Sequence, residues 1–357
     1  MTAAPATPLA PTAGGHGSRV VELDALRGLA VIGIVWMNVF VYALPPAAYY
    51  SPVAFGGEAL ADRLFWAASF VLVEDKFRTL FALLFGAGVL ILWQRAPGWG
   101  AHLARMAVLM AIGLFHAVLL ADNDILRAYA LAGVVLPLFA GASVRVLALC
   151  ALTAMVVHLA GSAWIVRDWW PVLSGGGDAE TTRTLAATFG GDPEAIRWAL
   201  ERGQESIGER IARRSTGMLG PLTNAAAAVP LNLSSMLAGM ALWKAGMLAG
   251  EWNARRTLRF ALPLALIALP VLMALAGWLW SMDYDPAAIG ITALLLSPPV
   301  DLALGLAYAG LAMMIFSKKG AITRRFAAAG RLSLTNYLMT SVVLAVIFRS
   351  WGFGLFA

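Results

Sequence analysis

The chain has 357 residues, of which 60% are hydrophobic and 13% are charged, and its mean hydropathy is +0.76. Soluble domains are about half apolar and about a quarter charged, so this composition excludes an ordinary soluble enzyme and predicts an integral membrane protein. The net charge of +6 is better explained by membrane topology than by nucleic acid, so we expect the lipid bilayer as the partner. The single cysteine, Cys150, excludes an intramolecular disulfide framework.

Residues 1–18 are rich in alanine, proline, threonine and glycine, which predicts a disordered cytoplasmic tail. The stretch lacks the basic start of a secretory signal, so we expect the first apolar run to remain as an anchor. Runs near the roughly 20 residues that cross a bilayer then recur, and only helices satisfy their own backbone groups there along an open chain. They predict an all-α polytopic bundle of about nine spans, at 26–44, 77–94, 103–120, 125–140, 144–166, 225–250, 259–281, 287–316 and 332–349.

The spans fall into two predicted membrane bundles, five in residues 19–166 and four in 223–357. The intervening segment 167–222 predicts an extracytoplasmic amphipathic region, because it starts with two tryptophans and continues with "GDPEAIRWALERGQESIGERIARR". Asp192 is the expected N-cap of its main helix. Residues 58–75 predict a similar helix on the membrane surface. Together with 167–222, this segment predicts several interfacial helices.

The distribution of lysine and arginine predicts a cytoplasmic N-terminus. In that orientation 14 of these residues lie inside and 5 in the short outer connections, while the remaining 7 lie in 167–222. The excess inside follows the positive-inside rule, although the 7 residues weaken it. We therefore expect 121–124, 167–222 and 282–288 on the outer side.

Ionisable residues gather at one bend, "GLFHAVLLADNDILRAY", residues 113–129. His116 lies within an apolar run, and ionisable groups in membranes face the bundle interior or a cavity more often than lipid. Histidine suits proton transfer near neutral pH, so His116 is a candidate base, although a histidine satisfied by one hydrogen bond is the plain alternative. Asn123 favours a chain reversal that folds Asp122 over His116 as its orienting partner. Asp124 is expected mainly to cap the helix that follows.

Further polar side chains are predicted in the outer layer or, for Asn38 and Asp301, between the outer and the cytoplasmic layers. Asn38 can hold a carbonyl or a hydroxyl group. Lys76 and Arg78 begin the second span, where charge pairing alone is the alternative. Asp301 follows two prolines, and a carboxylate in that place is costly unless it lines a cavity. The candidate substrate-binding residues are Asn38, Lys76, Arg78, Asp124, Arg127 and Asp301.

A second polar layer is predicted at the cytoplasmic face. Asp24 and Arg27 are three residues apart on the first span, and "GRLSLTNYL" brings Arg331, Asn336 and Tyr337 to the same depth. Pairing, interfacial anchoring and interhelical hydrogen bonds would explain them structurally. The functional interpretation is a pocket for a phosphate-bearing donor, with the arginines binding its charge. The sequence contains no histidine and cysteine spacing typical of a metal site, so we expect no metal.

Four stretches of the chain resemble the YeiB-like family in order: "LDALRGLAVIGIVWMNVFVYALPPAAYYSP", "KFRTLFALLFGAG", "GLFHAVLLADNDILRAY" and "GRLSLTNYL". These bacterial multi-pass membrane proteins carry a domain of unknown function. The family is similar to transmembrane acyltransferases of the heparan-glucosaminide N-acetyltransferase type, which share the "LRG" start and an asparagine eleven residues after the arginine. The resemblance implies a location in the bacterial inner membrane and acyl-CoA as a donor. It does not imply any cofactor with certainty.

The chain differs from these relatives at three places. Asn123 stands where the family usually has glycine, and asparagine also tolerates the left-handed conformation. Residues 38–76 contain no histidine, whereas the heparan-type enzymes have a catalytic histidine in the loop after the first span. The chain stops at "GFGLFA", whereas relatives continue through another helix, so a truncated chain is an open expectation.

The combined interpretation is transfer of an acyl group from a cytoplasmic donor to an extracytoplasmic acceptor, with His116 as base and Asp122 as its orienting partner. The first alternative is a transporter or flippase of a small or lipid-linked substrate, in which the same residues bind and relay protons. The second is a non-catalytic membrane assembly partner, and a homo-oligomer is compatible with each.

Overall fold

The computed structural model describes residues 20–121, 124–217 and 219–357. Within these ranges the chain is helical and contains no strand, which confirms the predicted all-α class. The longer helices are α1 (Val21–Ala43), α3 (Leu60–Leu72), α4 (Lys76–Arg95), α5 (Trp99–Leu119), α7 (Val144–Val166), α13 (Val229–Lys244), α14 (Ala254–Ser281), α16 (Pro298–Phe316) and α18 (Ser333–Phe348).

Shorter helices connect and cover these. They are α2 (Ala47–Tyr50), α6 (Leu126–Val134), α8 (Trp170–Leu173), α9 (Ala179–Phe189), α10 (Pro193–Gly203), α11 (Ile207–Thr216), α12 (Leu219–Ala227), α15 (Pro286–Ile291) and α17 (Ala321–Arg331). Two 3₁₀ turns, Pro52–Ala54 and Leu136–Phe139, and a π-helical turn, Thr292–Leu296, complete the set.

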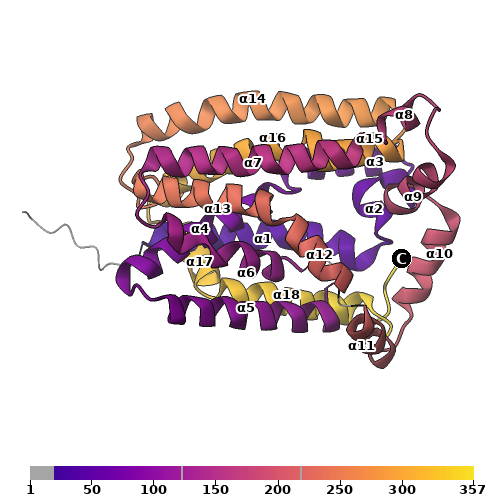
Figure 1. The fold of residues 1–357 in the computed structure, drawn as a ribbon, viewed down its shortest axis with the longest axis horizontal. Coiled ribbons are helices and arrows are strands. Elements are labelled where there is room, and N and C mark those ends of the chain that lie inside the picture. The colour runs from indigo at the N-terminus through magenta and orange to yellow at the C-terminus, as the bar shows by residue number, and fades with distance from the viewer. Residues whose placement is uncertain (1–19, 122–123, 218) are drawn as a thin grey trace, which may run out of the picture.

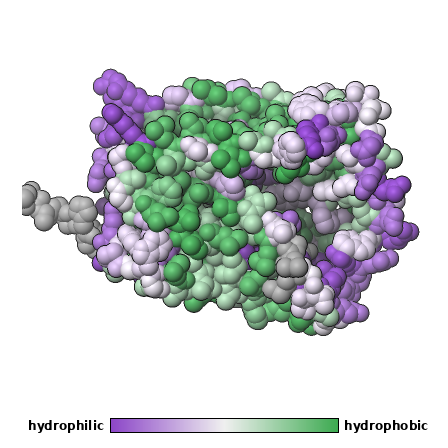
Figure 2. Space-filling view, in the orientation of Figure 1, coloured by the Kyte–Doolittle hydropathy of each residue, from purple (hydrophilic) through white to green (hydrophobic). Residues whose placement is uncertain are grey.

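The long helices run side by side along the longest axis of the molecule (Figure 1). At one end, which we name the α17 end, α1 begins, α4 ends and α17 lies. At the other, the α11 end, α1 and α5 end and helices α8 to α11 gather. Hydrophobic residues cover the middle of the visible face and hydrophilic residues lie at both ends (Figure 2). This is the surface of a protein that crosses a bilayer.

The number of spans differs from the predicted nine. Six helical segments within the described residues are long and apolar enough to cross a membrane, and a seventh is the pair α17 and α18, bent by 78°. The predicted spans 125–140 and 225–250 each divide into shorter helices, and 287–316 contains a π-helical turn before α16. Hydropathy averages over such breaks, which proline and local packing introduce.

The predicted surface helix over 58–75 also differs. In the structure α3 continues through a short break into α4, and together they form one apolar segment, Leu60–Arg95. Arg63 lies near its start, where it reaches Asp283 at 3.4 Å and lies over the Trp280 ring. Since the charged residues stand only at the first turn, the rest of α3 remains apolar and does not need the membrane surface.

Glycines allow the central helices to approach closely. A Cβ on Gly86 of α4 would lie 2.0 Å from the carbonyl oxygen of Met236 on α13, and a Cβ on Gly239 would lie 1.9 Å from that of Leu83. Close backbone approach at small residues is how helices associate in lipid, where the hydrophobic effect between them is weak. The two glycines therefore fix the α4–α13 crossing.

Helix α5 lies at the edge of this frame. Only 28% of the apolar 18-residue stretch of α5 is buried inside the structure, against 50% of the corresponding stretch of α1. Phe115 and Val108 on its outer face are exposed, whereas Met106, Gly113 and His116 on the inner face are buried. One side of α5 thus meets lipid while the other lines the interior.

Candidate functional site

The bend between α5 and α6 contains a buried histidine–aspartate pair. His116 Nδ1 lies 2.9 Å from Asp124 Oδ1, and the residues are 1% and 6% exposed. An ionised carboxylate only accepts hydrogen bonds, so Nδ1 carries a proton, and in the neutral form of the ring Nε2 is left as an acceptor. That Nε2 is buried without a hydrogen-bond partner among the described residues. A histidine oriented in this way is arranged as a general base.

The second oxygen of Asp124 organises the start of α6. Oδ2 accepts the backbone N–H of Arg127 at 3.1 Å and its Nε–H at 3.2 Å. The N-cap of α6 is Ile125, one residue after the predicted Asp124, yet Asp124 accepts a backbone N–H of the first turn while its other oxygen contacts His116. Gly113 makes room for this arrangement, because a Cβ there would lie 2.9 Å from Asp124 Oδ2.

The predicted partner of His116, Asp122, lies outside the described residues, so that pairing stays a prediction. Two other groups support the bend in the structure. The Tyr337 ring lies beside His116, with a centroid separation of 5.2 Å. Arg210 of α11 is 2% exposed and donates to the carbonyl oxygens of Leu119 and Leu120, each at 3.0 Å. These are C-terminal carbonyls of α5, which otherwise lack intrahelical partners.

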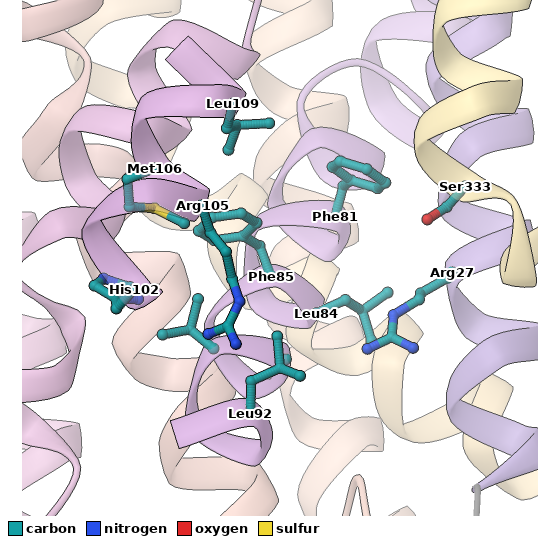
Figure 3. A pocket seen from close by; sticks show the side chains of 12 residues that line it. Arg27, Phe81, Leu84, Phe85, Leu92, His102, Arg105, Met106, Leu109 and Ser333 are labelled. Atoms are coloured by element: carbon teal, nitrogen blue, oxygen red, sulfur yellow. The ribbon is translucent and has the colours of Figure 1, made fainter. Parts of the chain in front are cut away.

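A pocket of about 290 Å³ opens toward the α17 end, between α1, α4, α5 and the start of α18 (Figure 3). Its basic and polar lining residues are Arg27, His102, Arg105 and Ser333. The walls are apolar, formed by Phe81, Leu84, Phe85, Gly88, Val89, Leu92, Met106 and Leu109. Apolar walls with two guanidinium groups are suited to an amphipathic anion.

The predicted donor-binding residues separate in the structure. Arg27 lines the pocket and bonds Asp24 Oδ1 at 2.9 Å. Arg331 is exposed, Asn336 donates to the Ala329 carbonyl across the α17–α18 bend, and Tyr337 lies beside His116. Arg105 and His102 line the pocket with Arg27, and neither was among the predicted donor-binding residues.

The pocket and the histidine pair share one face of α5. His102, Met106, Leu109, Gly113 and His116 recur at intervals of three or four residues, which places them on one side of a helix. Leu109 and His116 are seven residues apart, or roughly 10 Å along the axis. This spacing is visible in the sequence and was the available signal that these residues share one helix face. On α18, Tyr337 likewise lies one turn beyond Ser333, so the pocket and the histidine pair adjoin the same two helices.

A second buried centre joins α4 and α16. Lys76 Nζ lies 2.7 Å from Asp301 Oδ1, their side chains are 0% and 4% exposed, and Nζ also bonds the Phe70 carbonyl. Arg78 Nε pairs with Asp75 Oδ1 at 2.7 Å in the same region. The structure thus brings together Lys76, Arg78 and Asp301, which the sequence predicted only as separate candidates. Asn38 is buried in α1.

These features define a multi-pass helical membrane protein with ionisable groups buried at two centres and an amphipathic pocket. The chain is 30% identical over 340 residues to "Uncharacterized protein YeiB" of Escherichia coli (strain K12), covering 94% of this chain and 84% of that protein. It is 26% identical over 373 residues to "Uncharacterized protein YxaH" of Bacillus subtilis (strain 168), covering 95% and 83%. The family model "Protein of unknown function (DUF418)" matches residues 242–357. The chain therefore belongs to the YeiB-like family. No solved structure matches it.

Proposed function

We propose that the protein transfers an acyl group from an anionic thioester donor, bound in the pocket at the α17 end, to an acceptor hydroxyl or amine. The observation that carries the proposal is the His116–Asp124 pair, whose buried Nε2 has no partner among the described residues and lies on the pocket-lining face of α5. The excess of lysine and arginine at the α17 end favours its placement in the cytoplasm of a bacterial inner membrane.

The donor class follows from the chemistry of the pocket. Arg27 and Arg105 offer forked donors for phosphate groups, and Ser333 adds a hydroxyl. Leu109, which lines the pocket, and His116 lie roughly 10 Å apart along the same face of α5. An acyl group on a phosphorylated carrier with a flexible arm, as in acyl-CoA, spans this separation.

The proposed reaction begins with proton transfer from the acceptor to Nε2 of His116. Asp124 stabilises the imidazolium that forms, in the way a carboxylate supports a catalytic histidine. The acceptor atom then attacks the thioester carbonyl, the carbon–sulfur bond breaks, and the imidazolium returns its proton to the departing sulfur. Tyr337, whose ring lies beside His116, is our candidate donor to the oxyanion that develops.

Binding and transfer are tested separately with purified full-length protein. Arg105→Gln should weaken acyl-CoA binding, measured by thermal shift, by roughly tenfold, because it removes one charge-assisted contact. Arg145→Gln, exposed at the same end, is the matched control. His116→Ala should bind acyl-CoA like the wild type yet fail to transfer the radiolabelled acyl group to membrane acceptors. Unchanged transfer in His116→Ala would refute the assignment.

Transport of a small or lipid-linked substrate is a second candidate, favoured by the Lys76–Asp301 pair. This pair lies where two helices are interrupted, after the α3–α4 break and after the π-helical turn Thr292–Leu296. Interrupted helices with buried charge are typical of transporter sites. Substrate flux into liposomes that required Lys76 and Asp301 but not His116 would favour transport over transfer.

A further inference from the structure

The α11 end contains a cluster of basic residues outside the proposed catalytic site. Glu205 lies at its centre: Arg213 Nε and Nη2 reach its two oxygens at 2.9 and 2.5 Å, and Arg210 Nη1 lies 3.5 Å from it. Arg349, directly after α18, interacts electrostatically with Arg210 and Arg213, and Arg214 with Arg349. Helices α11 and α18 thus bring four arginines to one place.

Arg349 is the least satisfied of these groups. It is 8% exposed and lies over two aromatic rings, with its guanidinium carbon 5.7 Å from the Tyr42 centroid and 5.6 Å from that of Phe356. Its Nε is buried and has no hydrogen-bond partner in the part of the chain that the structure describes. A buried cation with an open donor is costly, and the cost falls when an anion supplies the missing bond.

The electrostatics of the cluster agree with this geometry. Burial, followed by repulsion from Arg210, lowers the pKa of the Arg349 guanidinium to about 10. Burial, followed by repulsion from Arg349, also lowers the pKa of Arg214. Glu205 attracts Arg349 but is shared with Arg210 and Arg213, so a negative ligand would further offset the repulsion among the arginines.

The surroundings indicate what kind of anion binds. Exposed apolar side chains lie on α10, on α11 and after α18, where Trp198, Ile207, Phe353 and Leu355 are 49%, 44%, 74% and 62% exposed. Aromatic and aliphatic groups at the end of a membrane bundle contact the boundary between headgroups and hydrocarbon. A ligand held here would place its charge on the arginines and its chain against these residues.

We propose that Arg349, together with Arg213 and Arg214, binds the phosphate group of an amphipathic lipid at the α11 end. Planar guanidinium groups match phosphate oxygens in pairs, which suits them better than lysine to this task. The inference goes beyond the proposed acyl transfer and does not depend on it. If both hold, the site anchors a lipid-linked acceptor close to the α5–α6 bend, which Arg210 contacts directly.

The test uses full-length protein in a neutral detergent, with thermal unfolding followed by tryptophan fluorescence. The probes are farnesyl phosphate, farnesol, which keeps the chain and lacks the phosphate, and inorganic phosphate. Farnesyl phosphate should raise the Tm in a saturable way, whereas farnesol should leave it unchanged. Arg349→Gln should weaken the apparent affinity roughly tenfold or more. Arg324→Gln, exposed at the α17 end, is the matched control and should bind like the wild type.

Two further variants keep the test informative if Arg349→Gln folds poorly. Arg349→Lys retains the charge and should lose less affinity, while Arg214→Gln, in a less buried place, should weaken binding as well. Equal shifts with farnesol and farnesyl phosphate, or wild-type affinity in both neutralised variants, would overturn the proposal. Equal affinity for inorganic phosphate would overturn its lipid part and assign the site to free phosphate. These experiments measure lipid binding and not acyl transfer. Their outcome is therefore independent of whether the proposed acyl transfer is correct.

Discussion

Neutralising one member of the Lys76–Asp301 pair should destabilise the protein more than neutralising both. The side chains are 0% and 4% exposed and the charged atoms are 2.7 Å apart, so water cannot replace a missing partner. Breaking a buried pair costs about 3–5 kcal/mol. For Asp301→Asn we expect the lower figure, since Lys76 keeps the Phe70 carbonyl and lies 5.1 Å from the Phe70 ring centroid. The free energy of unfolding of the double variant Lys76→Met, Asp301→Leu should lie within about 1 kcal/mol of that of the wild type. The double variant removes both the cost of desolvating the two charges and the attraction between them.

The free energy of unfolding is measured in mixed micelles by titration with a denaturing detergent, for the wild type, the single variants Lys76→Met and Asp301→Leu, and the double variant. Asp301→Asn is measured beside this cycle. The double-mutant cycle should give a coupling of at least about 2 kcal/mol. The partly exposed pair Arg78 and Asp75 is the internal control, and Arg78→Gln there should cost less than about 1 kcal/mol. If the double variant lost as much as the two single variants summed, the charges would not be interacting and the reasoning would be wrong.

Three further predictions concern the bend, the packing and the topology. Asp124→Asn should keep the bond to the first turn of α6 but lower the Tm, because the buried Arg127 loses its carboxylate partner. It should also lower acyl transfer by about 10³-fold or more, since an amide does not fix the histidine tautomer; near-normal transfer would remove Asp124 from the mechanism. Gly239→Ala should cost about 1–3 kcal/mol of unfolding free energy because its Cβ meets the Leu83 carbonyl, whereas Gly277→Ala, with open space around it, should be neutral or stabilising. Single cysteines at 318–320, in a Cys150→Ser background, should be protected from impermeant maleimide in intact cells, and labelling there would reverse the proposed orientation.

The fold class was predictable because it depends on local properties. Long apolar runs and the need to satisfy backbone groups in lipid are visible in any stretch of about 20 residues, and both led to an all-α bundle. The span count was not predictable in the same way. In 125–140, α6 ends at Val134 and Pro137 starts a separate 3₁₀ turn, although the whole stretch is apolar. Hydropathy does not record where a helix stops inside a protein.

The candidate site was predictable in its members more than in its pairings. His116 and Asp124 stand eight residues apart, and the pattern around Ile125 favoured a cap without showing that one carboxylate serves two partners. Lys76 and Asp301 lie far apart in the chain, so only tertiary structure pairs them. Arg105 carried no local signal beyond its charge, because its role depends on which helix faces α5 across the pocket.

The lipid-facing position of α5 has a consequence for how substrates arrive. One face of this helix carries the pocket residues and His116, and the opposite face, with Val108 and Phe115, is exposed. Entry beside such a helix would bring an amphipathic molecule to the pocket by diffusion within a leaflet. The relevant concentration is then the mole fraction in the membrane, and turnover in liposomes should follow lipid composition at constant substrate in the surrounding water.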